Sequence, residues 1–121
     1  MASVNMFKYE KNTLEIEAGH ELFREGDGAD LMYVVQHGEL DILINGTVVE
    51  TVGEGGVVGE MALVDQSPRS ATVVAKMDCM LVPFDESDFK THVHTTPFFA
   101  LQVMRVMVSR LRQMNELIGH L

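Results

Sequence analysis

The most informative stretch of this chain is GEMALVDQSPRSA, residues 59–71. It follows a glycine-rich turn at residues 53–56. Glu60 and the three residues after it are acceptable helix formers, but Pro68 comes only a few residues later, so we expect a single helical turn. The N-terminus of such a turn has unpaired N–H groups and a partial positive charge, which suits a phosphate. Gly59 allows the backbone to approach a bound group closely.

Arg69 and Glu60 have complementary chemistry. Arg69 is the only Arg or Lys between Arg24 and Lys76, and its guanidinium can hold two phosphate oxygens with a planar fork of donors. Glu60 is an acceptor that would repel phosphate but suits vicinal hydroxyls such as those of a ribose. This combination indicates a nucleotide. The alternatives are a surface ion-pair partner for Arg69 and a helix-end acid, stabilised by the helix dipole, for Glu60.

Residues 13–84 have the pattern of short strands joined by turns. Residues 40–44 alternate between apolar and other side chains, which is typical of a half-buried strand, and Asn45-Gly46 then predicts a type I′ hairpin with 47–52 as the return strand. Further strands are expected at 31–35, 72–75 and 80–82. Nine of the ten glycines lie between Gly19 and Gly59. This spacing predicts a sandwich or barrel with many corners.

Two helices are expected after Phe84. Asp85 can cap a short helix that has Asp88 in its first turn. Thr96-Pro97 resembles an N-cap followed by proline at the first helical position, and the long helix would continue to Leu121. Its apolar positions form a heptad seam: Ala100, Met104, Met107, Leu111, Met114, Ile118 and Leu121. We favour a parallel helix–helix dimer through this seam; the alternative is that every apolar residue packs on one core.

Composition excludes several classes of protein. The chain has 121 residues, enough for one domain, is 46% hydrophobic and carries a formal net charge of −9. Surplus negative charge disfavours binding to nucleic acid or to an anionic membrane, so an anionic ligand needs a local positive site. No apolar run approaches the length of a membrane span, the N-terminus lacks a secretory h-region, and the lone Cys79 offers no intramolecular disulfide. We therefore expect a soluble, cytoplasmic, single-domain protein spanning residues 1–121.

The motif at residues 59–71 resembles the phosphate-binding cassette of cyclic nucleotide-binding domains. That pattern runs Gly-Glu-aliphatic-small-Leu and then, after a few residues, Pro-Arg-Ser/Thr/Ala-Ala. Residues 19–27, 32–38 and 85–121 also resemble the family, so the likeness covers about residues 10 to 121. It implies a mainly β fold with flanking helices: a double-stranded β-helix (jelly-roll) barrel over about 13–84, a short cassette helix, and C-terminal helices over about 85–121 that end in a long one.

The resemblance also implies roles for matching positions. Arg69 would pair with the cyclic phosphate, Glu60 would accept from the ribose 2′-hydroxyl, and Ser70 would bind phosphate or base. In the catabolite-activator branch of the family, the position of Arg110 falls near that of Glu60, and those of Met114 and Asn115 fall near the purine. That branch has small hydroxyl residues at the last two positions, where this chain departs, although Asn115 could still bind an adenine edge. The apolar wall would be formed by Ile42, Val49, Val52 and Val57. The complete predicted ligand set is Ile42, Val49, Val57, Gly59, Glu60, Met61, Ala62, Arg69, Ser70, Ala71, Arg110 and Asn115.

The resemblance implies a sensor that binds its ligand and does no chemistry. We expect cyclic AMP, with cyclic GMP as the alternative, because serine after the arginine more often accompanies adenine in this family. The chain would be a homodimer, signal through its last helix, and hold no cofactor. No metal site is expected, because His92 and His94 are two residues apart and lie on different sides of a helix. Two alternatives remain: a ligand-free dimerisation module, and the sensor half of a DNA-binding transcription regulator.

Overall fold

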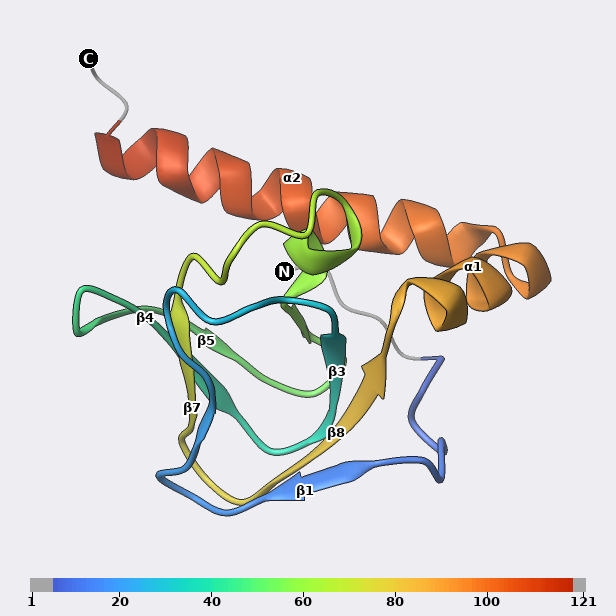
Figure 1. Cartoon of the computed structure of the whole chain (residues 1–121), viewed down its shortest axis with the longest axis horizontal. Helices are drawn as coiled ribbons and strands as arrows, with labels where there is room; N and C mark the ends of the chain where they lie inside the picture. Colours follow the sequence, from blue (N-terminus) through green and yellow to red (C-terminus); the bar gives the residue numbers. More distant parts are fainter. Residues whose placement is uncertain (1–5, 119–121) are drawn as a thin grey trace.

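The computed structural model describes residues 6–118, in which a β-barrel is followed by two helices (Figure 1). In chain order the elements are β1 (Leu14–Ile16), β2 (Glu21–Phe23), β3 (Met32–His37), β4 (Leu40–Ile44), β5 (Thr47–Val52), β6 (Val57–Val58), the single 3-10 turn η1 (Glu60–Leu63), β7 (Thr72–Ala75), β8 (Cys79–Phe84), α1 (Glu86–Thr95) and α2 (Phe98–Ile118).

The strands form two antiparallel four-stranded sheets. One has the order β1-β8-β3-β6 and the other β2-β7-β4-β5. Most neighbours in each sheet are distant in sequence, as in a jelly roll. The predicted mainly β, jelly-roll-like fold with a short cassette helix and a long C-terminal helix is therefore confirmed.

The hairpin between β4 and β5 follows the predicted turn chemistry. Asn45 and Gly46 have φ of 51° and 79°, as a type I′ turn requires. The ladder pairs Ile42 with Glu50 but Leu43 with Val48, so one residue of β5 is bulged out. This bulge changes the direction of the side chains that follow it.

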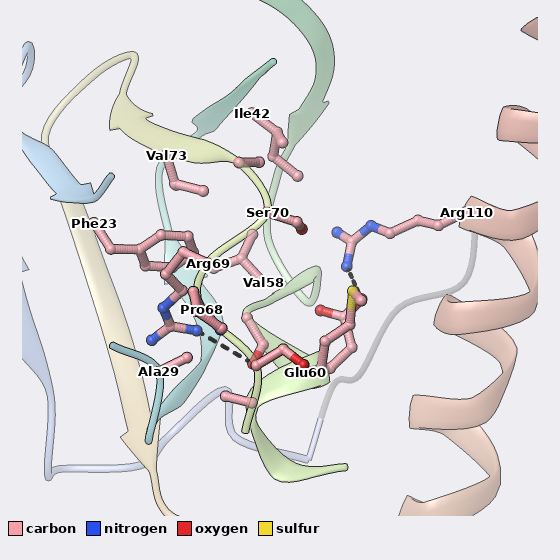
Figure 2. Close-up of a pocket in the computed structure, with 15 residues that line it drawn as sticks. Phe23, Ala29, Ile42, Val58, Glu60, Pro68, Arg69, Ser70, Val73 and Arg110 are labelled. Atoms are coloured by element: carbon pink, nitrogen blue, oxygen red, sulfur yellow. Dashed lines mark hydrogen bonds and ion pairs between the residues drawn. The ribbon is translucent and has the colours of Figure 1, made fainter. Parts of the chain in front are cut away.

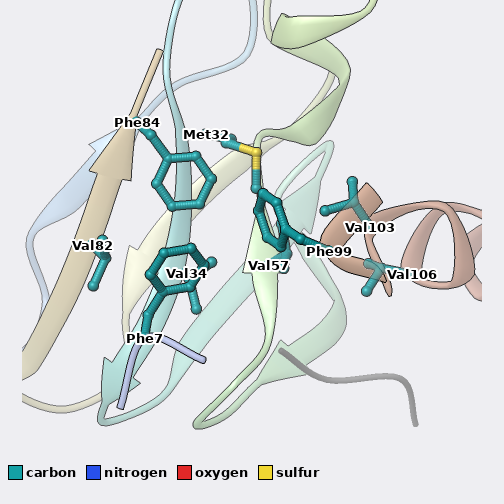
Figure 3. Close-up of a cluster of buried hydrophobic side chains, with 9 residues drawn as sticks. All are labelled: Phe7, Met32, Val34, Val57, Val82, Phe84, Phe99, Val103 and Val106. Atoms are coloured by element: carbon teal, nitrogen blue, oxygen red, sulfur yellow. The ribbon is translucent and has the colours of Figure 1, made fainter. Parts of the chain in front are cut away.

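Apolar side chains form two separate layers. One layer lies between the sheets and takes residues from both, including Val35, Leu40, Val58 and Leu81. The other covers the outer face of the β3-containing sheet beneath the helices (Figure 3), and consists of Phe7, Met32, Val34, Val57, Val82, Phe84, Phe99, Val103 and Val106. Adjacent residues of a strand enter different layers because side chains alternate across a sheet.

The two helices begin with recognisable signals. Asp85 and Asp88 form a reciprocal capping box at the start of α1, and the N–H of Phe99 donates to the carbonyl of Thr96 at the start of α2. Helix α2 packs on the barrel through Phe99, Val103 and Val106. Within residues 6–118, no helix is both long enough and apolar enough to cross a membrane.

Candidate ligand-binding site

A cleft opens between η1, the following loop and the barrel wall, with a cavity volume of about 110 Å³. This is smaller than the roughly 300–1,000 Å³ of typical small-molecule pockets. Its lining is mostly apolar, with guanidinium groups at two places, those of Arg69 and Arg110 (Figure 2). The cleft is lined by Phe23, Ala29, Ile42, Val58, Gly59, Glu60, Met61, Ala62, Ser67, Pro68, Arg69, Ser70, Ala71, Val73 and Arg110.

Gly59 fixes the geometry at the start of η1. Its φ is +76°, in the left-handed region that favours glycine. A Cβ placed on Gly59 would lie 2.6 Å from Nη1 of Arg69 and 3.1 Å from the carbonyl oxygen of Leu31. Glycine is therefore required here for two reasons: the backbone conformation and the close approach of the arginine.

Arg69 is a buried cation without an anionic partner. The residue is 9% exposed, its Nη2 donates to the carbonyl of Leu31 at 2.7 Å, and its guanidinium carbon lies 3.9 Å from the centroid of the Phe23 ring. No carboxylate in residues 6–118 forms an ion pair with it. Its Nε is buried and has no hydrogen-bond partner. A buried donor left in this state is costly unless an acceptor binds to it.

Glu60 projects from η1 and is 5% exposed. Its Oε1 accepts from Nη1 of Arg110 at 2.5 Å, which is also drawn in Figure 2. Arg110 donates in addition from Nε to Oε1 of Glu50 at 3.1 Å and from Nη2 to the carbonyl of Val57. Helix α2 is thus connected to β5, β6 and η1 through one side chain.

The two guanidinium groups of the cleft have opposite pKa shifts. Burial lowers the pKa of Arg69, and nearby acidic groups offset this only in part. Burial also acts to lower the pKa of Arg110, but its ion pairs with Glu60 and Glu50 outweigh the burial and raise that pKa above its ordinary value. Both groups stay protonated at neutral pH. The charge of Arg110 is neutralised by its carboxylate partners, whereas the charge of Arg69 has no carboxylate partner among the described residues.

The structure brings together most of the predicted ligand set. The nine predicted residues that line the cleft are Ile42, Gly59, Glu60, Met61, Ala62, Arg69, Ser70, Ala71 and Arg110. The predicted proximity of Arg110 to Glu60 is confirmed. No metal site was expected at His92 and His94. Within the described part of the chain, the structure shows no group of three or more His, Cys, Asp or Glu side chains that could hold a metal ion.

Three residues of the expected apolar wall do not line the cleft. Val57 faces the layer beneath α2, and its neighbour Val58 lines the cleft instead. The alternation of a strand explains this one-residue error. Val52 is buried between the sheets, away from the cleft lining, and Val49 is the bulged residue of β5 and is exposed. A bulge cannot be located from apolar alternation alone.

Asn115 and Met114 are not part of the cleft either. Both are exposed on α2, and neither lines the cleft. Asn115 is five residues beyond Arg110, about 7.5 Å further along the helix axis. The contact of Asn115 with the base stays a prediction, and in this structure the residue lies outside the cleft lining.

Sequence reasoning missed Phe23 and Glu50. Phe23 stacks against the Arg69 guanidinium, and Glu50 lies opposite Ile42 in the sheet and pairs with Arg110. An acid in a strand whose other residues are only valine and threonine was a usable signal for an internal charge partner, because a buried carboxylate needs one.

These features define a β-barrel with a cleft whose buried cation suits a small anionic molecule. A model of the cyclic nucleotide-binding domain matches residues 13–95, and the chain belongs to this family. The chain is 39% identical over 82 residues to a cAMP-dependent protein kinase regulatory subunit of Eremothecium gossypii, covering 65% of this chain and 18% of the relative. It is 32% identical over 109 residues to lysophospholipase nte1 of Aspergillus oryzae, covering 86% of this chain and 7% of the relative. The chain therefore spans less than a fifth of the length of these relatives.

Solved structures with the same fold include two nucleotide complexes. The catabolite activator protein of Thermus thermophilus matches with a TM-score of 0.77 and 25% identity, over 88% of this chain and 52% of that one. The cAMP-bound PfPKA-R matches with a TM-score of 0.74 and 26% identity, over 87% of this chain and 36% of that one. The cGMP-bound EAL enzyme Bd1971 matches with a TM-score of 0.64 and 30% identity, over 86% of this chain and 29% of that one.

Proposed function

We propose that this chain is a cytoplasmic sensor domain that binds a cyclic nucleotide, with cyclic AMP preferred, and that it acts by binding alone, without catalysis. The observation that carries this proposal is the buried guanidinium of Arg69, a residue that lines the cleft, has a buried Nε without a hydrogen-bond partner, and has no carboxylate among its described partners. A phosphate monoanion supplies both the missing charge and the missing acceptor.

Glu60 supports a sugar beside the phosphate. Arg110 donates only to Oε1 of this carboxylate, and no described residue donates to Oε2. A ribose hydroxyl is a neutral donor that suits this free acceptor, and hydrogen bonds to charged groups are among the stronger ones. The family membership and the similarity to cAMP-bound and cGMP-bound structures are consistent with the same ligand class.

The preference for adenine rests on Ser70, which lines the cleft directly after Arg69. In this family, threonine at that position more often accompanies guanine. The test is a calorimetric titration with cyclic AMP, cyclic GMP and the open-chain 5′-AMP. We expect cyclic AMP to bind more tightly than cyclic GMP and both to bind more tightly than 5′-AMP. Absence of binding by either cyclic nucleotide would refute the proposal.

A homodimer through α2 is a second element of the proposal. Large apolar side chains remain exposed along this helix: Leu101, Met104, Val108, Leu111 and Met114. Three of them belong to the predicted heptad seam, while Ala100 and Met107 of that seam are half-buried. The side chains of Ile118 and Leu121 lie outside the described residues. Ligand binding would then be signalled through α2, since Arg110 joins this helix to Glu60.

The dimer is tested by the mass of the protein in solution. We expect the unmodified chain to sediment as a dimer, and Leu111→Lys to shift it to monomer while leaving cyclic nucleotide affinity within a few-fold. A substitution of the exposed Arg112 to Ala provides the control on the same turn of the helix. A monomeric unmodified chain would contradict this part of the proposal and support the view that the helix packs only on its own barrel.

A further inference from the structure

Arg110 distributes its three nitrogens among three different elements. Nε donates to Glu50 on β5, Nη1 to Glu60 on η1, and Nη2 to the carbonyl of Val57 on β6. The side chains are 21% exposed for Arg110, 14% for Glu50 and 6% for Glu60, so these contacts are largely shielded from water. One cation therefore faces two carboxylates in a confined space.

This arrangement restricts how Arg110 can contact Glu60. A guanidinium usually holds a carboxylate through two parallel hydrogen bonds, one to each oxygen. Here only Nη1 reaches Glu60, and it reaches Oε1 alone. Nη2, which shares an edge with Nη1 and could complete a fork, donates to the carbonyl of Val57, and Nε on the adjoining edge donates to Glu50 at 3.1 Å. Oε2 of Glu60 is thereby left without a described donor.

Glu50 can act on the ligand only through Arg110. It is opposite Ile42 in the β4–β5 ladder, but it does not line the cleft, whereas Ile42 and Arg110 do. The small hollow that Glu50 does line lies against α2, with Val106 and Ser109. No other basic group of the described residues forms an ion pair with it.

We propose that Glu50 is a positioning residue for sugar recognition: by holding Nε of Arg110, it fixes the guanidinium in the orientation that leaves Oε2 of Glu60 available to the ribose 2′-hydroxyl. This inference rests on the proposed function. When Glu50 is removed, the guanidinium loses the partner of Nε and can rotate to place two donors on both oxygens of Glu60, where it competes with the sugar. The phosphate contact of Arg69 is unaffected by this change.

The experiment compares the affinities of cyclic AMP and 2′-deoxy cyclic AMP for each variant. The ratio of the two dissociation constants isolates the 2′-hydroxyl, because any general change in charge or stability affects both ligands equally. In the unmodified chain we expect a preference of about tenfold or more for cyclic AMP, the scale of one hydrogen bond to a charged acceptor. In Glu50→Ala we expect this preference to fall at least about fivefold, towards no discrimination.

Two further variants complete the design. Glu54→Ala removes the same charge four residues away, where the side chain is 66% exposed and contacts His37, and it should keep the original preference. Glu50→Gln retains an oxygen that accepts from Nε and should give an intermediate preference; it also serves if the alanine variant does not fold.

The outcomes separate the two proposals. If the unmodified chain binds neither ligand, the proposed function is refuted, and this inference with it. If it binds cyclic AMP but Glu50→Ala weakens both ligands equally, Glu50 only holds α2 against the barrel and this inference alone is overturned. An unchanged preference in Glu50→Ala, or no preference in the unmodified chain, overturns it as well.

Discussion

Replacement of Arg69 by alanine should lower the affinity for the ligand strongly while changing the free energy of unfolding only a little, so it tests the role of this residue in binding. In the bound state, Arg69 would form a buried ion pair with the phosphate through its otherwise unpartnered Nε. Removing one partner of a buried ion pair costs about 3–5 kcal/mol. The expected loss of cyclic AMP affinity is therefore about two to four decades.

The unliganded protein should be affected much less. Arg69→Ala removes the hydrogen bond to the Leu31 carbonyl and the contact with the Phe23 ring, but it also removes a buried cation that has no described ion-pair partner. These effects oppose each other, and we expect the free energy of unfolding to change by less than about 2 kcal/mol. Calorimetry measures the affinity, and urea unfolding without ligand measures the stability.

Arg24→Ala is the matched control. This substitution removes the same charge as Arg69→Ala. The Arg24 side chain, however, is 68% exposed and pairs with Glu21 at the surface, where ion pairs contribute little to stability. Its affinity for cyclic AMP should stay within about twofold of the unmodified chain. The reasoning is refuted if Arg69→Ala binds cyclic AMP within threefold of the unmodified chain, or if Arg24→Ala loses as much affinity.

Three other predictions concern the scaffold. Gly59→Ala should destabilise the fold by about 1–2 kcal/mol and weaken ligand binding, because the new Cβ would meet the Arg69 side chain. The control Gly28→Ala should change neither stability nor binding, because a Cβ there meets nothing within 4 Å. Equal urea midpoints for the two variants would contradict this prediction. Burial raises the pKa of the Cys79 thiol, so a disulfide reagent should label Cys79 only when the protein unfolds. The stability that the protonated thiol contributes should be complete below the ordinary thiol pKa and should be lost as pH rises through the raised pKa of the folded state. Rapid labelling of the native chain would disprove this. Asp85→Ala removes one half of the capping box of α1 and should cost about 1 kcal/mol in urea unfolding with cyclic AMP affinity unchanged, whereas a marked loss of affinity would show that α1 contributes to the site.

Much of the fold was predictable because its signals are local. Asn45-Gly46 determines a tight hairpin through its positive φ angles, Asp85 caps α1, and the Gly59 motif marks the only short helical turn between strands in the described chain. Arg69 was found because it is the only Arg or Lys between Arg24 and Lys76, and Glu60 because it lies at the start of the same motif.

What escaped prediction depends on register and on contacts between distant segments. Val57 and Val58 are equally apolar, and only the pairing of β6 with β3 decides which one faces the cleft. The bulge that turns Val49 outwards is a property of the β4–β5 pair and not of either strand alone. Glu50 pairs with Arg110, which lies sixty residues away in the sequence and is brought beside Glu50 by the packing of α2 on the barrel.

The central claim is that the Arg69 side chain and the Glu60 carboxylate together hold a cyclic nucleotide, and a crystal structure of the chain grown with cyclic AMP tests it most directly. The account predicts a phosphate oxygen within about 3.2 Å of Nε of Arg69 and the ribose 2′-hydroxyl at Oε2 of Glu60. A nucleotide bound elsewhere, or one in this cleft with its phosphate away from Arg69, would contradict it.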